Sequence, residues 1–428
     1  MAVTVFKNMF IGKPFAIRIK SMDNYLEKII EYAANKNTYY RNKISKAGCA
    51  LDGFELLDRS TLQQYGMDII SDSYKHKVNE LFITHSSGST GVPITVYWDH
   101  SDYLVSMRTL WERRRKYYGI TPLSKKIQFT MATNLQSPCL QYKFDKTYTV
   151  LSFESSSMNS KENMLSTWKL INRFQPEWIY VQPSVLKQLI ETAICNNIRA
   201  PRSIRYIECI GEMLYSELRI TAADFFHNAQ IASMYGSEEM NGIGIECPYH
   251  KMHIISDNVY AEIYSGGICS EYGEGDAVIT HLRNYAQPLI RYMQGDIINL
   301  TAPIKCECGY EDKIIDKIIG RVRERVFLEN DGVEINNFIL NDCIRIINQK
   351  YGDTIKRYKF KFYKSQCVLS ALLYIDCEDE ILFCRIKEFI TLYLYNKNVK
   401  NIRLNFEFKM YDKYEAVMNK YRTFEVVN

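Results

Sequence analysis

Between residues 147 and 236, short apolar runs alternate with longer amphipathic segments. The short runs have the length and the β-branched or aromatic content of buried strands: TYTVLSF (147–153), EWIYVQP (177–183), IRYIECIG (204–211) and AQIASMYG (229–236). Segments with helical periodicity, such as SVLKQLIETAICNN (184–197), separate them. This order predicts an α/β fold in which crossover helices join the strands of a mostly parallel sheet.

The pattern changes twice after this region. From about residue 253 the runs HIISDNVYAEIY, DAVITHL, PLIRYM and DIINL follow one another closely, which predicts an antiparallel, barrel-like β region. After residue 320, helical and strand-like segments indicate a compact α+β module of about a hundred residues. We therefore expect a large N-terminal domain over residues 1–320 and a small mobile C-terminal lid domain over residues 321–428.

Charge and hydropathy restrict the location and the partners of the chain. The 428 residues carry a formal net charge of +5, which is too small to indicate nucleic-acid binding. The first 20 residues lack the apolar core of a signal peptide, and no run approaches the roughly 20 apolar residues of a membrane span. We expect a cytoplasmic protein with neither a nucleic-acid nor a membrane partner; no oligomeric state follows from the sequence.

The stretch SSGSTG (86–91) is a candidate phosphate-binding loop. Ser86, Ser87, Ser89 and Thr90 offer hydroxyl groups, while Gly88 and Gly91 allow a backbone to approach a ligand closely. A Walker loop would need a lysine after the last glycine, where Val92 stands. The dinucleotide fingerprint also fails, because NGIGIEC (241–247) has Cys247 in place of the last glycine.

The run WERRRKYYG (111–119) places basic residues between aromatic ones. Such a run could bind nucleic acid or the phosphates of coenzyme A. We interpret it instead as a solvated helix face between buried Trp111 and Tyr118.

Four metal-ligating residues occur in two short segments. ECPYHKMHI contributes Cys247 and His253, and CECG contributes Cys306 and Cys308. A Cys₃His set suits tetrahedral zinc, and four protein ligands would make the site structural because no position stays open for water. His250 is a rival ligand to His253.

Six motifs, in order along residues 80–428, resemble the adenylate-forming, AMP-producing ligases, and among them the phenylacetate–coenzyme A ligase and CapK-like branch. They are SSGSTG (86–91), ECIGEML (208–214), YGSEEM (235–240), PLIRYMQGD (288–296), IIGRVRERVFLENDGVEI (318–335) and NKYRTFEV (419–426). The cysteine and histidine segments also resemble a zinc knuckle found in this branch.

The resemblance implies a role for each motif. Residues 86–91 would hold the β- and γ-phosphates of ATP. The adenine and ribose would be bound by Gly211, Glu212, Tyr235, Gly236, Asp296 and Arg321. Glu239 would hold Mg²⁺, and Lys420 would bridge the substrate carboxylate and the α-phosphate. The C-terminal domain would swing about a hinge at Arg323.

Several positions depart from the family pattern. Glu238 replaces the usual threonine before the metal-binding glutamate, so either Glu238 or Glu239 could hold Mg²⁺. Met293 and Gln294 stand where arginine and threonine are usual, and Val92 replaces a frequent lysine.

The resemblance implies an enzyme that activates a small-molecule carboxylic acid with ATP, releases pyrophosphate and transfers the acyl group to an acceptor. The phenylacetate ligases favour coenzyme A as that acceptor, whereas CapK-like proteins favour an amine or sugar in polysaccharide biosynthesis. The departures also leave open a non-catalytic relative that binds an acid or a nucleotide. The identity of the acid does not follow from the residues.

Overall fold

A computed structural model describes residues 22–44, 50–86, 93–130, 140–158, 160–322, 325–328, 334–412 and 423–427. The chain divides into two compact units. The described residues of the first unit fall within Met1–Gln294 and Leu300–Asp316. Those of the second fall within Gly295–Asn299, Lys317–Glu415 and Tyr421–Asn428.

The predicted parallel sheet is present in the first unit. Its parallel strands are β3 (Lys126–Thr130), β5 (Val150–Glu154), β6 (Trp178–Val181), β7 (Tyr206–Ile210) and β8 (Gln230–Ser237). Strand β3 pairs with both β5 and β6, and the ladder continues from β6 through β7 to β8. The edge strand β4 (Tyr142–Phe144) pairs antiparallel with β5. Because the strands run parallel, their carboxyl ends meet at one edge of the sheet.

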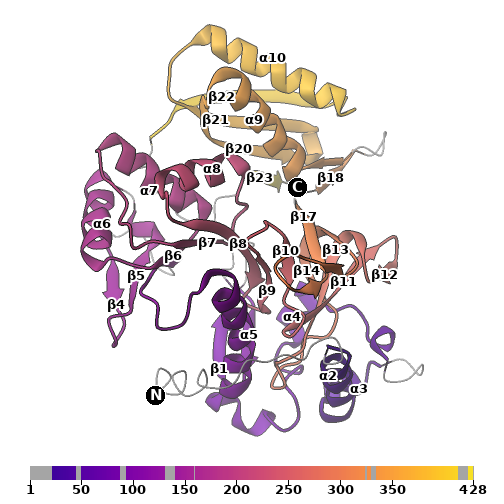
Figure 1. The fold of residues 1–428 in the computed structure, drawn as a ribbon. Helices are drawn as coiled ribbons and strands as arrows, with labels where there is room; N and C mark the ends of the chain where they lie inside the picture. Colours follow the sequence, from indigo (N-terminus) through magenta and orange to yellow (C-terminus); the bar gives the residue numbers. More distant parts are fainter. Residues whose placement is uncertain are drawn as a thin grey trace. The chain divides into compact units, whose positions relative to one another are not determined.

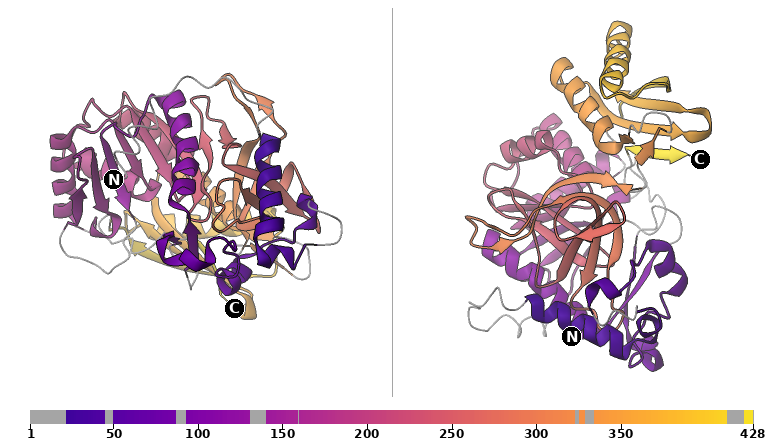
Figure 2. Two further views of the ribbon diagram at one scale, coloured as in Figure 1. Left: turned by 90° about the horizontal axis from the view of Figure 1, so that it is seen from below. Right: turned by 90° about the vertical axis from the view of Figure 1, so that its right-hand side faces the viewer.

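Crossover helices join these strands, as the alternation predicts. They are α6 (Lys161–Phe174), α7 (Pro183–Cys195) and α8 (Ser216–Phe225). Two of them have a residue suited to a helix start: Ser160 caps α6 by accepting from the Asn163 N–H, and Pro183 opens α7. Figure 1 shows these helices on one side of the parallel strands and α5 (His100–Tyr118) on the other, and Figure 2 shows the same layers from two further directions.

Antiparallel strands extend the same sheet beyond β8. They are β9 (Asn241–Glu246), β10 (Met252–Ile254), β11 (Val259–Ser265), β12 (Ile268–Ser270), β13 (Gly273–His281), β14 (Tyr292–Leu300) and β17 (Ile314–Arg321). In the described part of the chain, the hydrogen-bonded order is β12-β11-β13-β14-β17-β10-β9-β8-β7-β6-β3-β5-β4. The β region expected to be barrel-like is thus joined to the parallel strands, with the change of direction between β8 and β9.

Shorter elements complete the first unit. They are α2 (Met22–Lys36), α3 (Thr38–Arg41), α4 (Arg59–Tyr65), the hairpin β1 (Phe82–His85) and β2 (Thr95–Trp98), and the hairpin β15 (Ile304–Lys305) and β16 (Glu311–Asp312). Buried side chains tie the N-terminal segment to the sheet. The Tyr40 hydroxyl donates to the Pro288 carbonyl and accepts from the Ile290 N–H.

The second unit has the expected α+β character. Strands β20 (Ile355–Tyr363), β21 (Val368–Ile375), β22 (Arg403–Met410) and β23 (Phe424–Val427) form a sheet in the order β22-β21-β20-β23. Helices α9 (Asn337–Tyr351) and α10 (Glu380–Asn396) accompany it, with the short pair β18 (Arg325–Phe327) and β19 (Glu334–Asn336).

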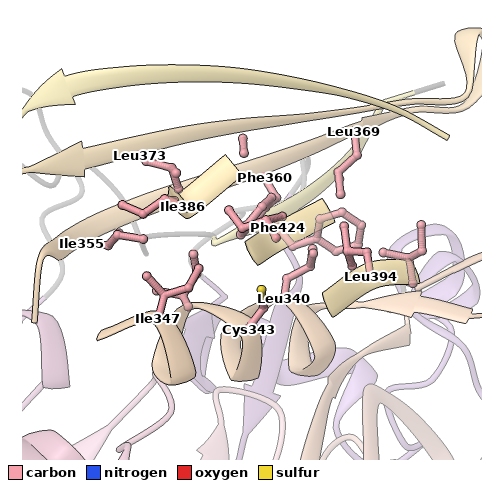
Figure 3. Close-up of a cluster of buried hydrophobic side chains, with 14 of the residues drawn as sticks. Leu340, Cys343, Ile347, Ile355, Phe360, Leu369, Leu373, Ile386, Leu394 and Phe424 are labelled. Carbon is pink, nitrogen blue, oxygen red and sulfur yellow. The ribbon is translucent and has the colours of Figure 1, made fainter. Parts of the chain in front are cut away.

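Figure 3 shows the core of this second unit. Leu340, Cys343 and Ile347 project from one face of α9 at helical spacing. They meet Phe360 of β20 and Phe424 of β23, all fully buried. This continuous apolar cluster gives the second unit a core of its own.

The interpretation of residues 113–116 as a solvated helix face is wrong for its first two arginines. Arg113 and Arg114 are each 3% exposed, although Arg115 and Lys116 do lie on the surface. The Arg114 guanidinium makes two hydrogen bonds, of 2.8 and 2.5 Å, to the carboxylate of Glu208 on β7, which is itself fully buried. The burial of Arg114 and Glu208 is tolerated because their opposite charges lie in direct contact.

Replacing Arg114 by alanine should destabilise the protein by about 3–5 kcal/mol, because Glu208 would be left charged and unpaired in the interior. Urea unfolding followed by circular dichroism measures the change. Arg115→Ala is the matched control, since this neighbouring exposed arginine should stay within about 0.5 kcal/mol of wild type. Equal effects of the two substitutions would contradict the importance of the buried pair.

Candidate active site

The carboxyl ends of β7 and β8 bring two predicted nucleotide-binding segments side by side. Ile210 pairs with Met234 in the parallel ladder, so Gly211 and Tyr235 follow at neighbouring strand ends. Gly211 has φ +73°, a left-handed conformation that favours glycine, and a side chain added there would meet no atom within 4 Å. The chain therefore turns away from β7 beside an open space at the sheet edge.

Gly236 has a role in the geometry of the sheet. A Cβ atom added at this position would lie 2.2 Å from the backbone oxygen of Asn241. The glycine therefore permits the close turn by which β8 passes into β9, where the pairing changes from parallel to antiparallel.

The Glu212 carboxylate contacts the start of helix α7. It accepts hydrogen bonds from the Ser184 N–H at 2.9 Å and from the Ser184 hydroxyl at 3.0 Å. A carboxylate at a helix N-terminus satisfies backbone donors and complements the helix dipole. Glu212 thus fixes the loop after β7 against α7, the crossover helix that precedes this strand.

Glu239 lies at the turn between β8 and β9 and is buried, with 4% of its surface exposed. Its Oε1 atom accepts a hydrogen bond of 3.2 Å from the Tyr292 hydroxyl and lies 3.6 Å from an Arg59 nitrogen. Glu238, its rival as a magnesium ligand, is exposed at the same turn. The buried carboxylate is thus held in place from two directions.

Ser86 is the one residue of the SSGSTG motif that the structure describes. Its hydroxyl accepts hydrogen bonds from the Ile94 N–H at 2.8 Å and from Arg59 at 3.3 Å. The Ser86 N–H in turn donates to the Ile94 carbonyl, so residues 86 and 94 are paired beyond the ends of β1 and β2. The other predicted phosphate-binding residues, 87–91, lie outside the described residues, as do Arg323 and Lys420.

Asp296 and Arg321, both predicted to bind ribose, form an ion pair. The Arg321 Nε atom lies 2.8 Å from Asp296 Oδ1. Asp296 is buried on β14 while the Arg321 side chain is 45% exposed on β17. Gly295, which precedes the aspartate, has φ +81°, a backbone conformation that favours glycine.

The four predicted metal ligands meet in one cluster. The ligating atoms of Cys247, His253, Cys306 and Cys308 all lie within 4.8 Å of one another. Cys247 Sγ is 4.0 Å from Cys306 Sγ, and Cys308 Sγ is 3.4 Å from His253 Nε2. A tetrahedral zinc site with Zn–S bonds of about 2.3 Å requires ligand separations of roughly 3.5–3.8 Å. The donor set therefore fits zinc.

His250 is not part of this cluster. Its side chain is 64% exposed, with Nδ1 3.7 Å from Glu246 and 3.3 Å from Arg219. His253 is fully buried, because the pairing of β10 with β9 and β17 holds it inside the sheet.

A second layer of side chains surrounds the cluster. His253 Nδ1 lies 3.6 Å from Asp312, whose carboxylate accepts from Arg113 at 2.7 Å and from Ser256 at 2.8 Å. Burial acts to raise the pKa of Asp312, but His253 and the Arg113 charge lower it to about 2. The ionised aspartate lies on the Nδ1 side of the imidazole, so the other ring nitrogen, Nε2, faces the thiols.

The cysteines differ in their electrostatic surroundings. Burial acts to raise the pKa of the Cys306 thiol, but the Cys308 N–H and hydrogen bonds from His253 lower it to about 7. Burial raises the pKa of Cys247 to about 12.

Sequence reasoning missed Arg59, Tyr292 and Asp312. Arg59 had one local signal: it occupies the first position of α4, directly after the capping residue Asp58. A cation there opposes the helix dipole, so its presence indicates a role outside the helix. Tyr292 and Asp312 carried no comparable signal, because their partners are distant in sequence.

These sites can be compared with those of known proteins. A family model described as AMP-binding enzyme matches residues 34–260. The chain belongs to this family and is an AMP-forming acid ligase. Within the family it is an adenylate-forming ligase of the phenylacetate–coenzyme A ligase and CapK-like branch.

Two curated relatives represent this branch. A phenylacetate–coenzyme A ligase of Thermus thermophilus is 24% identical over 72% of this chain and 71% of its own length. The protein CapK of Staphylococcus aureus is 22% identical over 77% of this chain and 72% of its own.

A solved structure of 2-hydroxyisobutyryl-CoA ligase, in the postadenylation state with 2-HIB-AMP, has the same fold, with a TM-score of 0.71. The match covers 95% of this chain and 88% of that one at 16% identity.

Among the helices that the structure describes here, each is too short or too polar to cross a membrane.

Proposed function

We propose that the protein activates a carboxylic acid with Mg·ATP and then transfers the acyl group to coenzyme A. In the first step a carboxylate oxygen attacks the α-phosphorus of ATP, and pyrophosphate leaves. In the second step the coenzyme A thiol attacks the acyl carbonyl, loses its proton, and AMP leaves. The observation that carries the proposal is the grouping of Ser86, Arg59 and Glu239 in a member of the AMP-binding family.

Each residue has a task in the first step. Residues 86–91 would bind the β- and γ-phosphates, and Glu239 would hold Mg²⁺, which would offset charge on the departing pyrophosphate. Gly211, Glu212, Tyr235 and Gly236 form the adenine side, and Asp296 accepts hydrogen bonds from the ribose with Arg321 beside it. Lys420 stabilises the negative charge that develops between the carboxylate and the α-phosphate.

Coenzyme A is the acceptor that the comparisons favour. Two curated relatives are named phenylacetate–coenzyme A ligase. The solved 2-hydroxyisobutyryl-CoA ligase has also been observed with 2-HIB-AMP and CoA together. A fixed binding mode for both ligands converts acyl transfer into an effectively intramolecular step.

Zinc at Cys247, His253, Cys306 and Cys308 forms a second part of the proposal. The compact Cys₃His set and the Asp312 carboxylate behind His253 support it. With four protein ligands the ion would be structural, linking β10 and the turn after β9 to the hairpin β15–β16. The zinc ion would contribute to folding and would take no part in the activation of the acid, which would occur at the phosphate-binding residues.

Metal analysis should find about one zinc ion per chain in protein purified without added metal. Cys306→Ser should lose that ion and unfold at a lower temperature, because binding energy becomes folding energy. Cys195→Ser is the matched control, since Cys195 is exposed and outside the cluster. Wild-type protein without zinc, or a Cys306→Ser variant that retains it, would refute the metal site.

Pyrophosphate release from Mg·ATP should depend on a suitable acid in a panel of aryl, fatty, hydroxy and amino acids. Lys420→Ala should lower the rate at least about a hundredfold while ATP binding persists, because the lysine acts on charge that develops in the transition state. Lys413→Ala controls for general loss of charge in the same segment.

Adding coenzyme A should raise turnover by discharging the acyl-adenylate, whereas adding amines or sugars should not. Acid-dependent release that Lys420→Ala retains in full would refute the role of that lysine. Acid-dependent release that coenzyme A does not accelerate would refute the acceptor.

A further inference from the structure

Arg59 links two parts of the candidate active site that lie far apart in sequence. One terminal nitrogen donates to the Ser86 hydroxyl at 3.3 Å, and the other lies 3.6 Å from Glu239 Oε1. The arginine side chain is 22% exposed, so it is neither free in solvent nor sealed in the core. Its guanidinium therefore stands between the first residue of the phosphate motif and the buried carboxylate proposed to hold Mg²⁺.

The neighbours of Arg59 hold it in this position. The Asp58 carboxylate accepts from the Thr61 N–H at 2.7 Å and caps α4, which fixes where the helix begins. Leu57 pairs with Tyr292, the residue whose hydroxyl donates to Glu239. The segment that carries Arg59 is thus bound to the strand that supports Glu239.

The phosphate motif lacks a cation of its own. Val92 follows Gly91 where the family frequently has lysine, so residues 86–92 contain hydroxyl groups and glycines but no positive side chain. Polyphosphate carries several negative charges, and Glu239 adds another. A cationic side chain from elsewhere in the fold would add to the charge that Mg²⁺ offsets and would bind phosphate oxygens directly.

We propose that Arg59 supplies this cation and binds the β- and γ-phosphates of ATP, and hence the leaving pyrophosphate. The guanidinium offers planar paired donors that match phosphate oxygens and stays charged at every physiological pH. Its contact with Glu239 would hold the carboxylate and the guanidinium ready before the nucleotide arrives. This assignment rests on the proposed function, because it presumes that ATP binds beside Ser86.

The alternative is that Arg59 merely neutralises the buried Glu239. The two roles differ in which nucleotide they affect. A phosphate-binding arginine is needed for ATP and for pyrophosphate, but AMP has no β- or γ-phosphate for it to contact. A purely structural arginine would act in one of two ways. Through the shape of the site it would alter the affinity for ATP and AMP alike, or alter neither; through Glu239 and its Mg²⁺ it would alter the affinity for Mg·ATP but not for ATP titrated without Mg²⁺.

Calorimetric titration of the full chain with Mg·ATP, with ATP in the absence of Mg²⁺ and, separately, with AMP distinguishes these roles. Arg59→Ala should weaken ATP binding, with and without Mg²⁺, by about tenfold or more and change AMP binding by less than about twofold. Arg59→Lys, which keeps the charge, should recover part of the lost ATP affinity. Thermal unfolding of each variant verifies that it is folded, and Arg59→Gln replaces the alanine variant if that one is not.

Arg199→Ala is the matched control, because Arg199 is an exposed arginine in the connection that precedes β7, at the opposite end of that strand. It should leave both affinities unchanged. Three results at Arg59 would overturn the assignment while the proposed function stands: wild-type affinity for Mg·ATP, an equal loss of ATP and AMP affinity, or a loss confined to ATP with Mg²⁺. Wild-type protein that binds neither nucleotide would overturn both.

Discussion

Two adjacent buried arginines of helix α5 connect this helix to two separate parts of the first unit. Arg114 pairs with Glu208 on β7, the strand that leads into the candidate adenine-binding turn. Arg113 pairs with Asp312 on β16, beside the cluster of three cysteines and His253. A buried charge without its partner is strongly unfavourable, so arrangements that separate these pairs are disfavoured, and the pairs constrain where the helix, the sheet and the cluster lie relative to one another.

The candidate active site lies where the sheet changes direction. Strand β8 runs parallel to β7, and β9 returns antiparallel to it after the turn that contains Glu239. Such a change places backbone and side chains at the carboxyl ends of parallel strands, where ligands of α/β proteins commonly bind. Gly236 makes the close turn geometrically possible, and Tyr292 and Arg59 orient the buried carboxylate.

Local sequence patterns predicted the elements but not their long-range partners. In residues 147–236, the spacing of apolar residues indicates which side chains of each segment are buried. The alternation of strands and helices, and hence the parallel sheet, could therefore be predicted from the sequence. The burial of Arg113 and Arg114 could not be predicted in this way, because their partners are 199 and 94 residues away. Without knowledge of these acidic partners, a run of basic residues is expected to be exposed to solvent.

The same distinction applies to the candidate site. The motif order indicated Asp296 and Arg321 as ribose-binding residues, and the structure shows them as an ion pair with an N–O distance of 2.8 Å. Spacing left His250 and His253 open as zinc ligands, and only the pairing of β10 with its neighbours brings His253 to the thiols. Arg59 precedes Glu239 by 180 residues, so no local pattern connects them.

Formation of an acyl-adenylate can be tested by following oxygen atoms through the reaction. The acid that supports pyrophosphate release is labelled with oxygen-18 in its carboxylate and supplied with Mg·ATP and coenzyme A, and the nucleotide product is analysed by mass spectrometry. Attack of the carboxylate on the α-phosphorus predicts AMP that carries a single labelled oxygen. Unlabelled AMP, or ADP together with labelled phosphate, would contradict an acyl-adenylate intermediate.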